Sequence, residues 1–171
     1  MLQVNPKVLV SYSWDDEDHK TWVRELSSRL VTNGVDVRLD EWHVKPGESL
    51  TTFMESNIVE CDFTIVICTP NYAERSVKRK GGVGYEQQII SGSIISGTNR
   101  KKFIPIVRNG EFEAGEKCAI PPHFLGVRAI DMRTSVDENF SFESLLRAIW
   151  DEPSFKPPEL GKKPVFGPYK T

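Results

Sequence analysis

The sequence predicts an α/β domain of the flavodoxin-like class, with a five-stranded parallel sheet and helices on both faces. Five segments of strand character alternate with helical or loop segments and are joined mostly by short links. The first of these segments is continuously apolar, which indicates a strand covered on both faces. A length of 171 residues matches one domain of ordinary size.

The first half of the chain contains two expected strands, each followed by an expected helix. Residues 7–13 form the first strand, which we place at the centre of the sheet. A helix with an acidic first turn begins after residues 15–18 and ends near Gly34. Residues 35–40 alternate like a strand nearer an edge, residues 41–48 form a loop with a Pro-Gly turn, and residues 49–60 form the second helix.

The second half of the chain continues the same alternation. Residues 62–68 are an apolar strand, and we interpret the polar residues 69–80 as a loop because of Pro70 and a basic triplet. A helix is expected from near Gly84 to Ser96, followed by a strand at 103–107, a loop at 109–122, an edge strand at 125–130 and a last helix at 140–150. Together these segments place the domain at residues 1–150.

Residues 151–171, hereafter the tail, have a different character. Five prolines fall within the last 19 residues. Such a composition does not form regular structure, so we expect an extended segment, either packed along the domain or linking it to a sensor domain or partner protein.

The overall composition excludes several classes of protein. A net charge of -2 gives no general attraction to nucleic acid or to an anionic membrane. No apolar run approaches 18 residues and the start lacks signal-peptide character, so we expect a cytoplasmic protein without a membrane partner. Cys61 and Cys68 flank a strand and are expected to be buried thiols. The three histidines are too scattered to predict a metal site, and no cofactor is expected.

A glycine-rich segment at residues 81–84 provides the first candidate for chemistry. It follows an apolar strand and a polar connection, and it precedes a helical pattern whose first turn carries Glu86. In an open α/β sheet, ligands bind outside the carboxyl ends of the strands, where this segment is expected. Glu86 is therefore our candidate for a functional carboxylate. The alternative is an ordinary glutamate that is favoured at a helix start by the helix dipole.

Three further segments, in order along the chain, resemble the three sequence boxes of the TIR and SEFIR domain superfamily. The boxes are residues 8–13 with Asp15 and His19, then Leu39-Asp40 with Gly47 and Leu50, then residues 66–72. The resemblance covers residues 7–150. His19 and residues 40–42 are similar to SEFIR members, whereas residues 81–86 are similar to bacterial TIR-type effectors.

The resemblance implies two classes of function. Some members are interaction modules that signal by self-association, and others cleave the nicotinamide-ribose bond of NAD+ in bacterial antiphage or innate immune defence. In the enzymatic members a glutamate on the third helix is catalytic, and Glu86 falls at that position. The loop at residues 41–48 resembles the loop that mediates head-to-tail assembly, which assigns subunit contacts to Trp42, Lys45, Pro46 and Gly47. An aromatic residue often precedes the catalytic glutamate by four positions; here Gly82 occupies that position, and Tyr85 is the replacement we consider.

One carboxylate is sufficient for this reaction. Glycosidases that act on ordinary sugars need a second carboxyl group to protonate a poor leaving group. Nicotinamide in NAD+ is already cationic and leaves as a neutral molecule, so the protein needs only to hold the ribose and stabilise an oxocarbenium-like transition state. Glu86 has the chemical character for that role.

The remaining substrate-binding candidates lie where the first and second strands end. Ser11, Tyr12, Ser13 and Trp14 are candidates for contacts with ribose and phosphates, although the two aromatic residues are equally explained by packing. Asp40 is a candidate acceptor for a ribose hydroxyl, or it caps the following loop. We expect an NAD+ glycohydrolase, with a non-catalytic interaction module as the alternative. A flavin carrier or receiver domain fits the fold alone, but no phosphorylatable aspartate ends the third strand.

Overall fold

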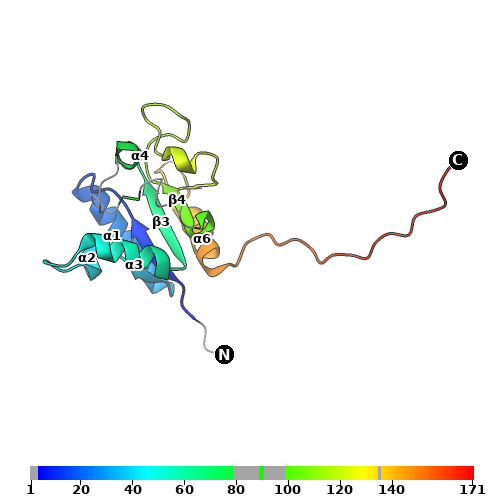
Figure 1. The fold of residues 1–171 in the computed structure, drawn as a ribbon, viewed down its shortest axis with the longest axis horizontal. Coiled ribbons are helices and arrows are strands. Elements are labelled where there is room, and N and C mark those ends of the chain that lie inside the picture. The colour runs from blue at the N-terminus through cyan, green and yellow to red at the C-terminus, as the bar shows by residue number, and fades with distance from the viewer. Residues whose placement is uncertain (1–3, 79–88, 91–98, 135) are drawn as a thin grey trace.

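The computed structural model describes residues 4–78, 89–90, 99–134 and 136–171. Its first half contains β1 (Lys7–Ser11), α1 (Glu17–Thr32), β2 (Asp36–Arg38), α2 (Asp40–His43), α3 (Leu50–Glu60) and β3 (Phe63–Cys68). Its second half contains α4 (Pro70–Lys78), the 3-10 helices η1 (Arg100–Lys102) and η2 (Pro122–Phe124), β4 (Phe103–Val107), β5 (Ile130–Asp131) and α6 (Glu138–Trp150). The expected α/β architecture is confirmed (Figure 1).

The sheet contains five parallel strands in the order β2-β1-β3-β4-β5. Successive residues of β1 point to opposite faces, so Val8 and Val10 belong to one core cluster and Leu9 to the other. Residues of α1 and α6 pack in the first cluster, and residues of α3 pack in the second. Helices therefore cover both faces, as the continuous hydrophobicity of β1 and β3 indicates.

Helix α1 shows how local sequence sets the element bounds. The Asp16 carboxylate accepts a hydrogen bond from the His19 amide, and Asn33 ends the helix next to Gly34 at φ 87°. A Cβ atom at Gly34 would also lie 2.9 Å from the Trp150 ring of α6. The expected helix end at Gly34 is confirmed, and the residue is required there for both conformation and space.

The prediction that the first strand lies at the centre of the sheet is wrong. β3 is the central strand, and β1 lies between β2 and β3. Both strands are covered by helices on two faces and both are continuously apolar, so hydrophobicity alone does not distinguish their positions.

The polar segment interpreted as a loop at residues 69–80 contains a helix instead. Pro70 occupies the first helical position, where its missing N–H is not needed and its fixed φ suits a helix. The Thr69 hydroxyl accepts a hydrogen bond from the Tyr72 amide at 3.1 Å. Pro70 therefore starts α4 rather than breaking regular structure.

Several further boundaries differ from expectation; for example, β1 ends at Ser11 rather than residue 13, and β2 ends at Arg38 rather than residue 40. The edge strand is Ile130–Asp131 rather than residues 125–130, because Leu125 and Val127 are exposed and flank a turn at Gly126, which has φ 86°. The first residues of the loop expected at 41–48 belong instead to the short helix α2, which ends at His43. The helix expected from Gly84 to Ser96 falls outside the described residues except for Ile89 and Ile90, which are both buried.

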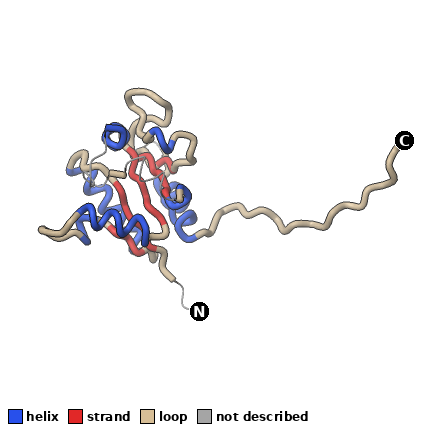
Figure 2. The backbone as a smooth tube through the Cα atoms, viewed as in Figure 1, coloured by secondary structure: helices blue, strands red, loops and turns tan. Residues whose placement is uncertain are grey.

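The tail contains neither helix nor strand, and its side chains are exposed. Figure 2 shows it running as an extended line away from the domain after α6. Asp151 ends α6 in the left-handed conformation, with φ 55°. The division of the chain into residues 1–150 and the tail stays a prediction.

Candidate functional site at the carboxyl edge of the sheet

The strands end together along one edge of the sheet because all five are parallel. Strand order reverses between β1 and β3, since the chain proceeds from β1 outward to β2 and then returns to β3 on the other side. Ligands of such folds bind in the crevice at this switch point. Most of the described candidate residues follow β1 or β2 at this edge, and the third sequence box continues from β3 into α4.

Tyr12 and Asp40 form a buried pair that joins the end of β1 to the start of α2. The Tyr12 hydroxyl donates to the Asp40 carboxylate at 2.6 Å, and only 7% of Asp40 is exposed. Burial raises the pKa of Asp40, while hydrogen bonds from Tyr12, the Glu41 amide and Trp14 act in the opposite direction. Burial, and then the nearby Asp40 charge, raise the pKa of Tyr12. Asp40 therefore has partners within the protein already, which favours its structural role.

Ser11 and Ser13 are fully buried between the ends of β1 and β3. The Ser11 and Tyr72 hydroxyls lie 2.7 Å apart, and the Tyr72 hydroxyl accepts a hydrogen bond from the Ile90 amide at 3.0 Å. These bonds connect β1, α4 and the segment that follows Glu86 in the sequence.

A second set of bonds lies beside the first. The Ser13 hydroxyl donates to Asp15 and lies 3.3 Å from the Thr69 hydroxyl. The Asn71 amide donates to the same Asp15 oxygen at 2.7 Å. The loop after β1 is therefore attached to the start of α4 by polar side chains, with no exposed gap at Ser13.

Trp14 is the most accessible of the described substrate-binding candidates. Its exposed fraction is 39%, and the Lys20 ammonium lies 5.3 Å from the centre of its ring. At this edge, the exposed indole is able to stack on a ring of a ligand, and the neighbouring ammonium is able to attract a phosphate.

The proposed assembly loop is attached at its base and exposed at its tip. The His43 ring stacks on Phe53 with centroids 6.3 Å apart, and Arg24 pairs with Glu41 at 3.2 Å. Trp42 is 42% exposed. Lys45, Pro46 and Gly47 are exposed as well, with Gly47 at φ 91° in the turn.

Glu86 and Tyr85 lie outside the described residues, so the structure does not place the predicted catalytic residue. Thr69, Asn71 and Tyr72 belong to the third sequence box, but the sequence did not predict that their side chains fix the loop after β1. Their place directly after a buried strand was the signal that pointed to this edge.

Neither a membrane span nor a metal site is found in the described part of the chain. None of its helices is both long and apolar enough to cross a bilayer. Across residues 4–78, 89–90, 99–134 and 136–171, no three His, Cys, Asp or Glu side chains group to hold a metal ion. Cys61 and Cys68 are buried free thiols, as expected, and burial raises the pKa of Cys61 to about 11 and that of Cys68 to about 12.

The fold and its switch point define a doubly wound α/β domain, and comparison with known proteins specifies its family. The family profile described as TIR domain matches residues 8–146. The crystal structure of a prokaryotic SEFIR domain is 40% identical, with a TM-score of 0.76, and the match covers 92% of this chain and 100% of that one. A match over 92% of this chain is longer than residues 1–150, so it extends into the tail. The chain belongs to the TIR/SEFIR domain superfamily.

More distant structures share the fold. The TIR domains of the activated Roq1 resistosome, which directly recognises the pathogen effector XopQ, are 18% identical with a TM-score of 0.57. That match covers 85% of this chain and 99% of the other. The TIR domain of the Toll-related receptor TRR-2 from Hydra magnipapillata is also 18% identical with a TM-score of 0.57, over 83% of this chain and 96% of the other. A search of curated proteins gives no significant match.

Proposed function

We propose that this domain is an NAD+ glycohydrolase that becomes active when copies assemble. The observation that carries the proposal is the hydrogen bond from the Ile90 amide to Tyr72, whose hydroxyl lies 2.7 Å from that of Ser11. Ile90 follows Glu86 by four positions. Four residues of chain span at most about 14 Å, so this attachment limits the distance between Glu86 and the switch point of the sheet.

Glu86 is assigned the catalytic role because nicotinamide leaves NAD+ as a neutral molecule and needs no general acid. A carboxylate beneath the anomeric carbon holds the ribose hydroxyls and stabilises the positive charge that develops in the transition state. Product formation then depends on whether water or an adenine nitrogen reaches that carbon, giving ADP-ribose or a cyclic product.

The described residues at the edge are assigned positioning and binding roles. Ser11, Ser13 and Tyr12 bond to other side chains of the protein. We therefore assign them to shaping the carboxyl edge of the sheet rather than to direct contact with substrate. Trp14, which also bonds to Asp40, and Lys20, which also pairs with Glu17 at 3.6 Å, are proposed to contact the nicotinamide ring and a phosphate, respectively. Tyr85 is proposed to assist Glu86, and Asp40 to orient Tyr12.

The test is nicotinamide release from NAD+ by concentrated protein with a crowding agent. We expect release by the parent and none by Glu86→Gln. Glu116→Gln is the matched control, because Glu116 is an exposed carboxylate in a loop. Release by Glu86→Gln at the parent rate would exclude Glu86 as the catalytic residue.

The second candidate function is a non-catalytic module that signals by homotypic association, and the exposed loop tip favours it. A large aromatic residue left 42% exposed beside a lysine and a Pro-Gly turn has the composition of a contact surface. TIR domains in general self-associate, and the same loop serves both proposals.

The loop is tested by charge reversal. Lys45→Glu is expected to lower the association state measured by analytical ultracentrifugation, whereas Lys101→Glu, at an exposed residue of η1, is expected to leave it unchanged. If assembly depends on Lys45 but the parent releases no nicotinamide when assembled, the interaction module is the better description.

A further inference from the structure

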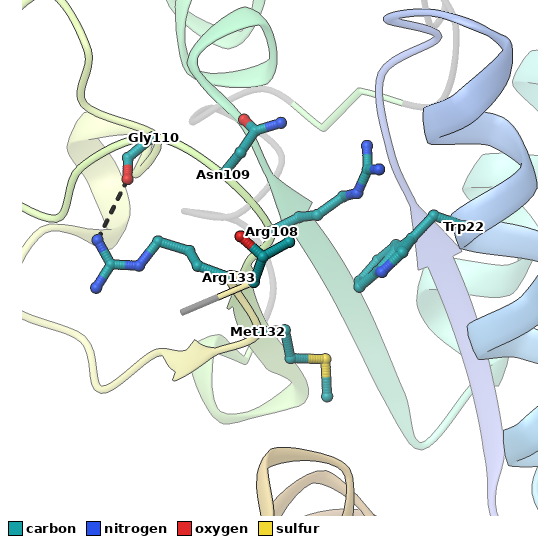
Figure 3. Close-up of a pocket in the computed structure, with 7 residues that line it drawn as sticks. Trp22, Arg108, Asn109, Gly110, Met132 and Arg133 are labelled. Atoms are coloured by element: carbon teal, nitrogen blue, oxygen red, sulfur yellow. Dashed lines mark hydrogen bonds between the residues drawn. The ribbon is translucent and has the colours of Figure 1, made fainter. Parts of the chain in front are cut away.

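A cavity of about 400 Å³ lies at the carboxyl ends of β4 and β5, beside α1 (Figure 3). It is lined by Trp22, Arg108, Asn109, Gly110, Met132, Arg133 and Thr134. None of these residues belongs to the NAD+ site or the assembly loop proposed above. The volume is in the range of small-molecule sites, which are often largely apolar with a few convergent polar groups.

Arg108 carries a charge at this cavity that no described carboxylate balances. Its guanidinium donates to the His19 Nδ1 atom at 2.7 Å and lies 5.2 Å from the centre of the Trp22 ring. Half-buried charges are normally paired. Arg133, across the cavity in Figure 3, is paired in this way: it bonds to both Asp131 oxygens, at 2.9 and 2.7 Å, and to the Gly110 carbonyl.

His19 does not supply the missing negative charge. A guanidinium only donates, so the Nδ1 atom of His19 accepts, and the proton of the neutral ring is on Nε2. Burial lowers the pKa of His19, and the Arg108 charge lowers it further, against the effect of Asp15 and Asp16. Those two carboxylates bond elsewhere, Asp15 to Ser13 and Asn71, and Asp16 to the start of α1.

We propose that this cavity binds the phosphate group of a small metabolite of mononucleotide size. The planar guanidinium of Arg108 presents most of its N–H donors without a described partner, in a geometry that matches phosphate oxygens. Asn109 and Thr134 add a neutral amide and a hydroxyl at the same cavity. Trp22 and Met132 provide apolar wall for the organic part of the ligand.

The test measures binding by calorimetry, with adenosine 5′-monophosphate as the probe. Adenosine and inorganic phosphate are the comparison ligands, and all three are measured at equal ionic strength. We expect saturable binding of the monophosphate, binding of adenosine weaker by at least about tenfold, and displacement of the monophosphate by inorganic phosphate. Absence of saturable monophosphate binding, equal binding of adenosine, or failure of phosphate to displace the probe would each overturn the proposal.

Variants locate the binding site. Arg108→Gln is expected to weaken monophosphate binding by at least about tenfold, whereas Arg128→Gln removes an exposed guanidinium and is expected to bind like the parent. In the parent, the monophosphate is expected to shift the NMR signals of the Trp22 indole and the Asn109 amide. Shifts confined to Trp14, or parent-like binding by Arg108→Gln, would place the probe at the sheet edge after β1 and overturn the proposal.

A second variant covers the case in which Arg108→Gln does not fold. Asn109 is exposed, so Asn109→Asp introduces a carboxylate at the cavity with little risk to the core. The new charge is expected to pair with Arg108 and to repel the phosphate, again weakening binding by about tenfold or more. Unchanged binding by this folded variant would contradict the proposal.

Discussion

Side chains at the carboxyl edge of the sheet form hydrogen bonds mainly with one another. Tyr12 and Asp40 illustrate this, because a hydroxyl group and a carboxylate are both removed from water and bonded at 2.6 Å. A buried acceptor that loses its donor bears the full cost of its desolvation. The pair therefore fixes the end of β1 against the start of α2, from which the proposed assembly loop extends.

Tyr12→Phe is expected to lower the free energy of unfolding by about 1–3 kcal/mol, since Asp40 stays buried without this donor. Urea denaturation of parent and variant measures the difference. Tyr169→Phe, in the exposed tail, is the control and is expected to stay within about 0.5 kcal/mol of the parent. A Tyr12→Phe protein as stable as this control would show that the pair contributes little.

His19 makes stability depend on pH. Its pKa in the folded chain is below the ordinary value because of burial, so the unfolded chain binds the proton more readily. The free energy of unfolding therefore falls as the pH is lowered below about 6.5, by at most about 1.4 kcal/mol per pH unit for one proton. This slope is expected to be smaller in His19→Gln, as measured by urea denaturation at several pH values.

Burial lowers the pKa of His123 as well, so the parent carries two contributions of the same sign. The difference between the parent and His19→Gln isolates the contribution of His19. Equal slopes in the two proteins would contradict the assignment.

At the scale of elements, helix caps set the bounds that composition alone misses. Asp137 is the N-cap of α6, and its carboxylate accepts hydrogen bonds from the Asn139 and Phe140 amides at 3.0 and 3.3 Å. Asp137→Ala is expected to destabilise the domain by about 0.5–2 kcal/mol in thermal or urea unfolding. Asp137→Ser retains a capping oxygen and is expected to recover most of that loss; if it is as unstable as Asp137→Ala, the cap is not the cause.

The same physics explains how much of the fold the sequence predicts. Residues 103–107 and the end of α1 were predicted correctly because apolar runs and a glycine stop are local signals. α4 was missed because Pro70 serves equally as a helix start and as a loop residue, and only the Thr69 cap distinguishes them. The order of β1 and β3 was missed because it depends on chain crossovers rather than on composition.

The site was predictable only in part for a related reason. Residues at the end of a single strand, such as Ser11, Tyr12 and Ser13, are adjacent in the sequence and were predicted together. Arg108 and His19 are 89 positions apart, and their contact exists only after β4 and α1 pack. No periodicity or motif in the sequence connects them.

For the whole molecule, the tail is the part with the fewest described contacts. Phe155, Leu160 and Tyr169 are at least 94% exposed. Deletion of residues 154–171 is expected to change the free energy of unfolding by no more than about 0.5 kcal/mol, measured by urea denaturation. The bonds between Arg147 and Glu152 at the end of α6 are retained in this variant. A loss above about 1 kcal/mol would show that the tail packs on the domain in solution.

The short outer strands of the sheet limit strand-to-strand pairing between copies of the domain. β2 has three residues and β5 has two, so neither edge offers a long row of free backbone groups to a neighbouring strand. We therefore expect any assembly of these domains to be held by side chains from loops and helices rather than by a shared backbone ladder. Side-chain contacts between charged groups weaken as salt rises, so we expect such an assembly to be sensitive to ionic strength.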